Sequence, residues 1–524
     1  MFVAGVKKSG DYYDSVTLML LARDLLKMEG VKDAAAVMGT EENLQLLNSS
    51  GMMAAELQGA GDTDLLIAVK ADDEKTAREA VERAGEMLRE SKKHRDEGSE
   101  HLPRSVEGAV KQMPGANLAI VSVAGRWAGD VAADALRRGL HVLLFSDNVS
   151  LEKEIELKRS AREKGLLLMG PDCGTAIING APLGFANVVP RGVIGIVAAS
   201  GTGLQEISSI IANQGEGVSQ AIGTGGRDVK KEVGGIMFLE GIEALVADPQ
   251  TRIIVLVSKP PHPEVEARIA AAVKKIKKPV VAILIGGEGQ LLREAGAEIA
   301  GNLEEAALLA VARARGKDAA GVRRRLEERK SEIAKRAAEL AAGLHPEQKF
   351  LRGLFSGGTL CDEVQLLLRG TIGDIFSNTP LSPKLKLPNS LVSRGHTVLD
   401  LGDDEFTVGR PHPMIDFSLR VRRLLEEARL PETAVVLLDV VLGYGSHLDP
   451  GGELAPAIRR ALEEANKAGR NLPIICSITG TEGDPQQRKK VEKELAAAGA
   501  VVMPTNASAA LLAGGIVKIA GEKR

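Results

Sequence analysis

The chain has 524 residues, which is too many for one hydrophobic core, and this length predicts three or four domains. Its formal net charge is -3 and its pI is near 6.3, so no electrostatic feature points to nucleic acid or to a membrane surface. Aromatic residues make up 2% of the chain, which also argues against stacking platforms for bases.

The three cysteines, Cys173, Cys361 and Cys476, are too few and too far apart for a disulfide framework or a Cys-rich metal site. They fit a reducing compartment. The first residues lack the order of a signal peptide, and no uncharged apolar run reaches the roughly 18 residues that a membrane helix needs. We therefore expect a cytoplasmic protein that binds no metal.

Residues 1–112 are expected to form a small α+β domain followed by a linker. Hydrophobic periodicity predicts strands at 2–6, 34–38 and 64–69 and helices at 15–27 and 74–90. This order suggests a βαββαβ plan. The stretch 91–113 is polar and lacks periodicity, so it reads as the linker.

Residues 113–191 alternate apolar runs and amphipathic stretches, which predicts a doubly wound, Rossmann-like domain. No Gly-x-Gly-x-x-Gly follows its first strand, so a dinucleotide is not expected. Its last strand runs into the turn 170–174, at the edge where open sheets bind ligands. The substrate-binding candidates in this turn are Gly170, Pro171, Asp172 and Cys173. No histidine is placed by the sequence to activate Cys173 as a nucleophile.

The rest of the chain contains a repeat. The run 193–207, an apolar strand that enters a helix through a Ser-Gly turn, recurs at 350–364, and 279–289 aligns without a gap on 473–483. We infer two related flavodoxin-like α/β domains, at 192–315 and 347–524. The Arg-, Lys-, Glu- and Ala-rich segment 316–346 between them is expected to be a solvated helical linker.

The two Ser-Gly turns are the strongest candidate site. Each places free backbone N–H groups and hydroxyls at a helix N-terminus, and such an end attracts anions. If the repeats pack about a pseudo-twofold axis, both ends converge on one anion, such as a phosphoryl group. The alternative is that each turn only caps its own helix. The phosphate-binding candidates are Ser200, Gly201, Thr202, Gly203, Ser356, Gly357, Gly358 and Thr359.

A second glycine loop, 223–228, follows another predicted strand. Gly225 and Gly226 would let the backbone approach a ligand, and Arg227 suits a carboxylate or a phosphate. We assign these three residues to substrate binding. Four histidines also follow predicted strands, but their spacing has no metal-ligand signature, and each reads more simply as a loop residue: His262, His396, His412 and His447.

These motifs resemble a known family. Between about 117 and 310, the segment 169–173 (Met-Gly-Pro-Asp-Cys) and the turns at 200–202 and 223–226 are similar to the alpha subunit of succinyl-CoA synthetase. The segments 398–402 and 435–439 are similar to the carboxy-terminal domain of its beta subunit. The fusion of both parts behind an extra amino-terminal domain resembles the FdrA family of acyl-CoA-synthetase-like proteins. This resemblance implies that the Rossmann-like domain at 113–191 is of the CoA-binding type.

The resemblance implies that the two Ser-Gly helix ends face a phosphoryl group, which the synthetase carries on a histidine. This chain departs from the synthetase pattern at two places. Glu294 occupies the place of that histidine, and the loop whose glutamate would support it reads Ser-Lys-Pro-Pro at 258–261. The chain also lacks an ATP-grasp segment and a recognisable CoA phosphate loop. A phosphohistidine relay is therefore not expected, and no cofactor is assigned with certainty, CoA included.

FdrA-type proteins are implied to act in allantoin and purine catabolism, as a subunit of an oxamate carbamoyltransferase with partner polypeptides. That enzyme would transfer the carbamoyl group of carbamoyl phosphate to oxamate, giving oxalurate and phosphate. The Ser-Gly turns would bind the phosphate, and Arg227 with the turn 170–174 would handle the acceptor or the carbonyl group. The alternatives are an acyl-CoA synthetase that works with a separate nucleotide-binding subunit, and a non-catalytic scaffold. The acid, the base and the acceptor stay unassigned.

Overall fold

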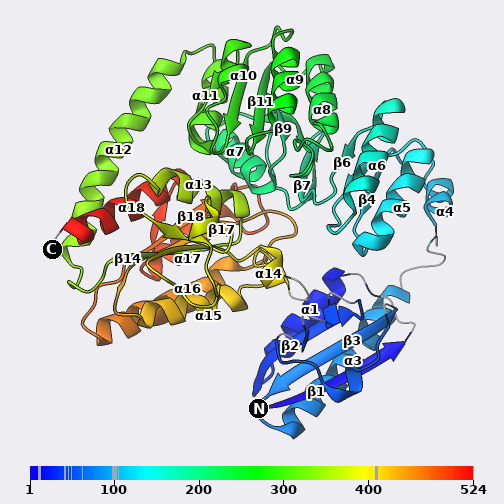
Figure 1. Cartoon of the computed structure of the whole chain (residues 1–524), viewed down its shortest axis with the longest axis vertical. Coiled ribbons are helices and arrows are strands. Elements are labelled where there is room, and N and C mark those ends of the chain that lie inside the picture. Colours follow the sequence, from blue (N-terminus) through cyan, green and yellow to red (C-terminus); the bar gives the residue numbers. More distant parts are fainter. Residues whose placement is uncertain are drawn as a thin grey trace.

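A computed structural model gives the arrangement of the chain as four α/β units and one long connecting helix (Figure 1). It describes residues 1–9, 13, 15–40, 43–44, 47–48, 50–61, 63–96, 103, 105–407 and 411–522. Among these residues, no helix is long and apolar enough to cross a membrane.

The first unit is a three-stranded antiparallel sheet in the order β1-β3-β2, packed against two helices. Its elements are β1 (Phe2–Ser9), α1 (Ser15–Leu26), β2 (Val31–Met38), η1 (Ala55–Leu57), β3 (Asp64–Ala71) and α3 (Glu74–Asp96). In the residues that the structure describes, the unit has the order βαββα. The predicted βαββαβ plan therefore has one strand too many, the last one. The predicted linker was also too long, since α3 runs to Asp96 and α4 (Val106–Gln112) lies within 91–113.

The second unit is a parallel sheet of three short strands in the order β4-β5-β6, with one helix after each of the first two. Its elements are β4 (Leu118–Val121), α5 (Gly125–Arg137), β5 (His141–Leu144), α6 (Leu151–Glu163) and β6 (Leu168–Met169). The following β7 and β8 fall within 113–191 but belong to the next sheet, because β7 pairs with β10.

The first repeat, called the first half below, has a seven-stranded sheet in the order β13-β12-β11-β9-β10-β7-β8. Its strands are β7 (Thr175–Ile178), β8 (Ala181–Gly184), β9 (Arg191–Ala198), β10 (Val218–Gly223), β11 (Ile253–Ser258), β12 (Val280–Leu284) and β13 (Glu298–Ile299). Its helices are α7 (Gly201–Asn213), α8 (Ile236–Ala247), α9 (Pro263–Val273), α10 (Gln290–Glu294) and α11 (Leu303–Ala314).

The second repeat, called the second half, has six parallel strands in the order β15-β16-β14-β17-β18-β19. Its strands are β14 (Phe350–Phe355), β15 (Ile375–Phe376), β16 (His396–Asp400), β17 (Thr433–Val441), β18 (Ile474–Thr479) and β19 (Val501–Met503). Its helices are α13 (Gly358–Leu368), η2 (Pro383–Leu385), α14 (Asp404–Thr407), α15 (Ser418–Arg429), α16 (Pro450–Lys467), α17 (Arg488–Ala497) and α18 (Asn506–Glu522).

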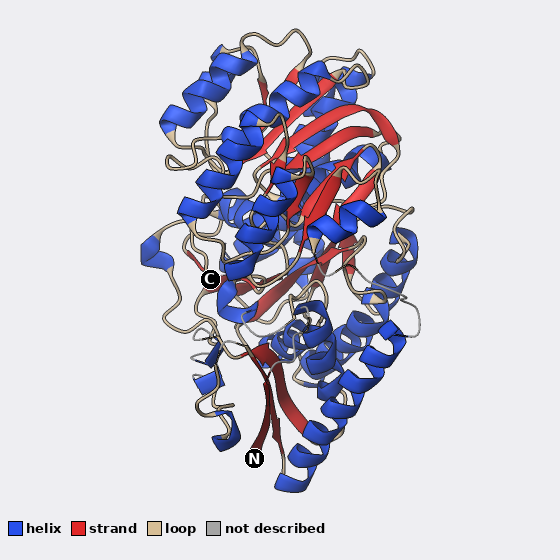
Figure 2. Cartoon of the chain, turned by 90° about the vertical axis from the view of Figure 1, so that its right-hand side faces the viewer, coloured by secondary structure: helices blue, strands red, loops and turns tan. Residues whose placement is uncertain are grey.

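The strand orders confirm the duplication. The series β10-β9-β11-β12-β13 of the first half matches β16-β14-β17-β18-β19 of the second, so α7 corresponds to α13 and α11 to α18. These parallel strands are buried along nearly their whole length, as expected of a sheet with helices on both faces (Figure 2). The predicted α/β fold class is therefore confirmed.

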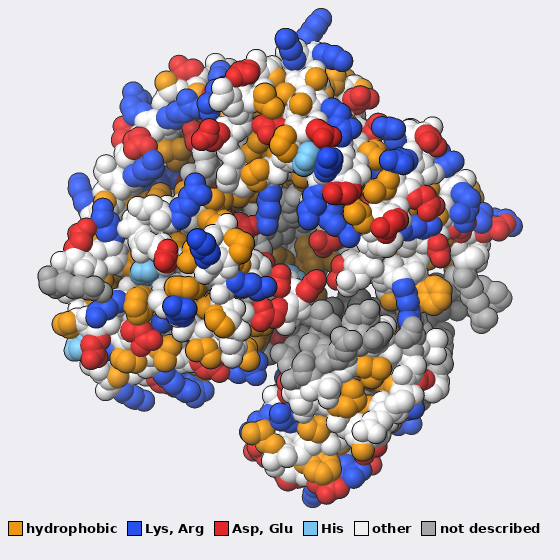
Figure 3. All heavy atoms as spheres, viewed as in Figure 1, with side chains coloured by type: hydrophobic (Ala, Val, Ile, Leu, Met, Phe, Trp, Pro, Cys, Tyr) orange, Lys and Arg blue, Asp and Glu red, His pale blue; other side chains and the backbone are white. Residues whose placement is uncertain are grey.

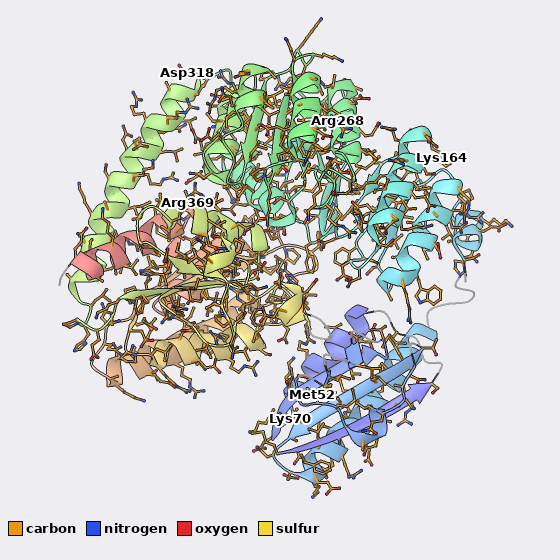
Figure 4. The ribbon with its side chains drawn as sticks, viewed as in Figure 1. Met52, Lys70, Lys164, Arg268, Asp318 and Arg369 are labelled. Atoms are coloured by element: carbon orange, nitrogen blue, oxygen red, sulfur yellow. The ribbon has the colours of Figure 1, made fainter. Side chains whose placement is uncertain are left out.

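The two halves are packed as one body. A single cluster of buried apolar side chains includes members of α7 and α11 from the first half and of α13 and α18 from the second, such as Leu204, Leu309, Leu360 and Leu512. The connecting helix α12 (Ala319–Ala342) begins after Asp318 at the first half and runs down to α18 (Figure 4). Its Val322 and Ile333 are buried in the same cluster, so it is more than the solvated linker predicted.

Candidate functional site

The two Ser-Gly helix ends meet. The hydroxyl oxygens of Ser200, at the start of α7, and Thr359, in the first turn of α13, are 2.7 Å apart and hydrogen-bonded. Ser200 is the N-cap of α7, and its Oγ also accepts the Gly203 N–H at 3.2 Å. The two helix ends therefore meet as predicted. The capping alternative holds for α7, because the Ser200 hydroxyl makes both bonds, but not for α13, whose N-cap is Gly357 and has no side chain.

The contact is reciprocal, as a twofold relation requires. A side chain on Gly357, the N-cap of α13, would come within 2.9 Å of Thr202 Cγ2, and one on Gly203 would come within 3.2 Å of Thr359 Cγ2. Glycine at these positions lets the two helix ends approach closely. Their positive dipole ends therefore point toward one region, which favours a negative charge there.

Part of the α13 end is already occupied by a carboxylate. Asp439, in β17, accepts the Ser356 hydroxyl at 2.9 Å and the N–H groups of Ser356 and Gly357 at 2.8 and 2.9 Å. Arg420 pairs with the same carboxylate at 3.1 Å, and all of these groups are buried. Ser356 and Gly357, two of the predicted phosphate ligands, thus bind Asp439 in this structure. Gly358 and Thr359 follow the two residues that Asp439 binds; the Thr359 hydroxyl is bonded to Ser200, and Asp400 lies beside Gly358.

Two buried glutamates lock the helix ends into position. Glu206 of α7 accepts the N–H of Asn506, the first residue of α18, at 3.0 Å. Glu363 of α13 accepts the N–H of Leu303, the first residue of α11, at 2.7 Å. Each half thus uses a carboxylate on its Ser-Gly helix to cap a helix of the other half. Burial raises the pKa of Glu206, and it raises the pKa of Glu363 to about 7.

The predicted substrate loops also lie together. Gly225 has a φ of +79°, and a side chain there would collide with the carbonyl oxygen of Pro171, so the loop 223–228 rests on the turn 170–174. By contrast, nothing lies within 4 Å of the Cβ position of Gly226. The turn approaches α7 through Thr175, whose Oγ1 is 3.9 Å from the Cβ position of Gly201. These loops therefore flank the α7 end.

Asp172 and Cys173 have different environments. Asp172 is exposed at the surface, but incomplete hydration by its surroundings, and then the neighbouring carboxylates of Asp147 and Asp404, raise its pKa to about 6. Burial raises the pKa of the Cys173 thiol to about 12, so Cys173 is not a thiolate nucleophile at neutral pH. In Figure 3, acidic side chains lie along the edge of the second half that faces the hollow in the middle of the view.

Arg227 has a structural role in this conformation. Its Nη2 donates to the carbonyl oxygen of Val149 at 2.7 Å, and its Nε pairs with Glu154 of α6 at 2.9 Å. Glu154 also pairs with Lys158, which in turn contacts Asp228 at 2.8 Å, and these three side chains are fully buried. Arg227 would have to exchange Glu154 for a substrate carboxylate before it could bind one.

Sequence reasoning missed one acidic residue beside the helix ends. Asp400 ends β16, and its Oδ2 is 2.5 Å from the Cβ position of Gly358. The sequence repeat contains a signal for Asp400, because this residue is the last of an apolar strand and the loop that follows it corresponds to the predicted substrate loop 223–228. His412, predicted to be an ordinary loop residue, lies at the same place, with Nε2 2.8 Å from the Cβ position of Gly402. Glu294, at the place of the synthetase histidine, is exposed and accepts from Gln290 at 2.9 Å.

Three family models match the chain. A CoA-ligase model matches residues 354–516, and a CoA-binding-domain model matches 191–286, in the first half. A third model, described as the heavy metal-associated domain of AllF, matches residues 1–103.

The residues of the N-terminal unit do not fit a heavy-metal site. Residues 1–103 contain no cysteine. Throughout the described parts of the chain, no group of three or more His, Cys, Asp and Glu side chains could hold a metal ion. We therefore derive no chemical step through a metal.

One relative matches along the entire chain. The uncharacterized protein YahF of Escherichia coli (strain K12) is 43% identical over 517 residues, which is 98% of each chain. The ADP-forming sulfoacetate-CoA ligase subunit SauD of Bilophila wadsworthia (strain 3_1_6) is 28% identical over 208 residues, 38% of this chain and 69% of SauD. The succinate–CoA ligase alpha subunit of Methanothermobacter thermautotrophicus is 28% identical over 205 residues, 38% of this chain and 67% of that subunit. The chain thus has a succinyl-CoA synthetase-like fold and belongs to the FdrA family of acyl-CoA-synthetase-like proteins.

Proposed function

We propose that the chain transfers a carbamoyl or acyl group from a phosphate anhydride to a small acid, as the FdrA-type subunit of an oxamate carbamoyltransferase. The observation that carries the proposal is the contact between Ser200 and Thr359, which brings two helix N-termini to one point. A phosphate placed there meets two positive dipole ends and two hydroxyls, so it is bound without a metal ion. The AllF-type N-terminal domain is consistent with a role in allantoin breakdown.

The proposed reaction needs few groups. The amide nitrogen of oxamate attacks the carbonyl carbon of carbamoyl phosphate, a C–N bond forms, and the C–O bond to phosphate breaks. The nitrogen loses one proton, and the departing phosphate gains one. Donors fixed at the helix ends stabilise the charge that develops on the leaving phosphate, which is the kind of electrostatic catalysis that preorganised sites provide.

The nature of residue 294 supports group transfer over a phosphohistidine relay. A glutamate carboxylate does not provide the imidazole nitrogen on which the synthetase carries its phosphoryl group. Lys259, in the loop that would support such a histidine, instead reaches across to Asp362 of α13 at 2.6 Å. A donor that brings its own phosphate, such as carbamoyl phosphate, removes the need for that relay.

Calorimetry tests the phosphate site directly. We expect the chain to bind carbamoyl phosphate and inorganic phosphate, and S200A and T359A each to weaken binding roughly 10- to 100-fold, since a hydrogen bond to a charged group contributes about 1.5–3 kcal/mol. S150A is the matched control, because Ser150 is the N-cap of α6 and lies outside the site. Wild-type affinity in both variants would refute the site. Product analysis with oxamate, with and without candidate partner chains, then tests the transfer.

A second candidate is an acyl-CoA ligase that works with a separate nucleotide-binding subunit, which the CoA-ligase and CoA-binding matches favour. In the second unit, CoA would have to approach the N-terminus of α5. There a side chain on Gly125 would collide with the carbonyl oxygens of Asp147 and Asn148, so the loop that holds these two residues lies against the start of α5. CoA binding without carbamoyl phosphate binding would favour the ligase. Binding of neither would favour a scaffold.

A further inference from the structure

Asp400 borders the phosphate site from the β16 side. Its Oδ1 accepts the N–H of Gly402 at 2.9 Å, and Asn378 fixes its backbone by accepting the Asp400 N–H at 3.0 Å. Its Oδ2 faces the first residue of α13, 2.5 Å from the Cβ position of Gly358. The carboxyl group thus has one oxygen held by its own loop and the other directed at the helix end.

His412 closes the other side of the same loop. Its Nε2 and Asp400 Oδ1 both border the Cβ position of Gly402, at 2.8 and 3.2 Å, and the carbonyl oxygen of Ser356 lies there as well. The N–H of Met414 donates to His412 Nδ1 at 3.2 Å, so the proton of the neutral imidazole is on Nε2. The ring packs against Phe185, with centroids 5.8 Å apart. Phe185 belongs to the first half, so the group sits where the halves meet.

The charges that face Asp400 come from several elements. Asp403 lies on its own loop, Asp362 on α13 and Asp439 on β17. Lys259 approaches from the first half and pairs with Asp362. Burial, opposed by the Gly402 N–H and reinforced by Asp403, raises the pKa of Asp400 to about 7. Burial lowers the pKa of His412 to about 4, so its imidazole is neutral at physiological pH.

We propose that Asp400 is the catalytic residue that carries the proton in the transfer reaction, and that His412 is a neutral hydrogen-bond donor beside it. This inference rests on the proposed function. Asp400 is protonated when the phosphate group of the donor binds next to it. As the C–O bond breaks, its proton passes to the leaving oxygen, which keeps the bonding electrons. The resulting carboxylate takes the proton that the acceptor nitrogen loses as the C–N bond forms, so Asp400 ends in its starting state.

Sulfate binding tests the protonated form of Asp400 without any turnover, because the charge of sulfate does not change between pH 6 and pH 8. If bound sulfate requires protonated Asp400, its affinity falls about tenfold from pH 6 to pH 8 in the wild-type chain. D400N should bind sulfate with nearly equal affinity at pH 6 and at pH 8. D374N is the control, since Asp374 is an exposed carboxylate elsewhere in the second half, and it should keep the wild-type slope.

The outcomes separate this inference from the proposed function. One outcome is that S200A weakens sulfate binding but the affinity of the wild-type chain does not change with pH. This result would overturn the role of Asp400 and leave the phosphate site in place. The wild-type measurement alone decides this point if D400N does not fold. Absence of sulfate binding, or no effect of S200A, would overturn both.

Turnover of the complete enzyme tests the catalytic roles. In carbamoyl transfer with its partner chains present, D400N should lower kcat about 10²- to 10⁴-fold while KM for carbamoyl phosphate changes little. H412F should lower kcat, and H412Q, whose amide nitrogen reaches the position of Nε2, should restore part of the loss. Equal activity of H412F and the wild-type enzyme would contradict the donor role of His412.

Discussion

Glu363 should make the stability of this protein depend on pH in a direction opposite to that of most carboxylates. Its pKa is raised by burial from 4.5 to about 7 in the folded chain. The folded state therefore keeps a proton that the unfolded state releases, and the free energy of unfolding falls as pH rises from about 4.5 to about 7. At about 1.4 kcal/mol per pH unit, this single group accounts for a loss of roughly 3 kcal/mol.

Glu363→Gln isolates this effect, because glutamine has the same shape and does not ionise. Urea unfolding followed by far-UV circular dichroism at pH 5, 6, 7 and 8 should show the free energy of unfolding of E363Q rising relative to the wild-type chain by about 2.5 kcal/mol from pH 5 to pH 8. Glu327→Gln, at a side chain that is 69% exposed on α12, serves as the control. Parallel pH profiles for the wild-type chain and E363Q would refute the reasoning.

Three further variants test other parts of the site. Asp439→Ala leaves Arg420 buried without its carboxylate and frees the donors of Ser356 and Gly357, so thermal unfolding should show a loss of about 3–5 kcal/mol, whereas Asp403→Ala should not. Lys158→Met leaves the buried Asp228 without its cation and leaves the buried Glu154 with Arg227 alone, and a loss of similar size is expected; a midpoint unchanged from the wild-type chain would contradict this. Cys173→Ser should keep full transfer activity, and iodoacetamide should label Cys173 only after unfolding.

The repeated motif made the central geometry predictable. Two copies of one strand-turn-helix sequence predicted two flavodoxin-like halves, and symmetry then predicted that α7 and α13 would face each other. The Ser200–Thr359 contact confirms this arrangement. Whether phosphate binds between the two ends stays a prediction.

Other parts of the site depend on contacts that no local pattern records. Asp439 reaches the α13 end from 83 positions further along the chain, and Glu206 caps a helix that begins 300 positions away. Hydrophobic periodicity reports which face of an element is buried, but not which polar group meets which helix end. For the same reason, the sequence pattern assigns Arg227 to substrate, whereas in the structure its guanidinium pairs with Glu154.

The helix α12 has a consequence for how the chain behaves at low concentration. In a two-subunit ligase, the paired helix ends exist only while the subunits are associated, so dilution dismantles them. Here both ends belong to one polypeptide, and joining them is an intramolecular event with a fixed one-to-one ratio. Anion affinity per chain should therefore stay constant from micromolar to nanomolar protein.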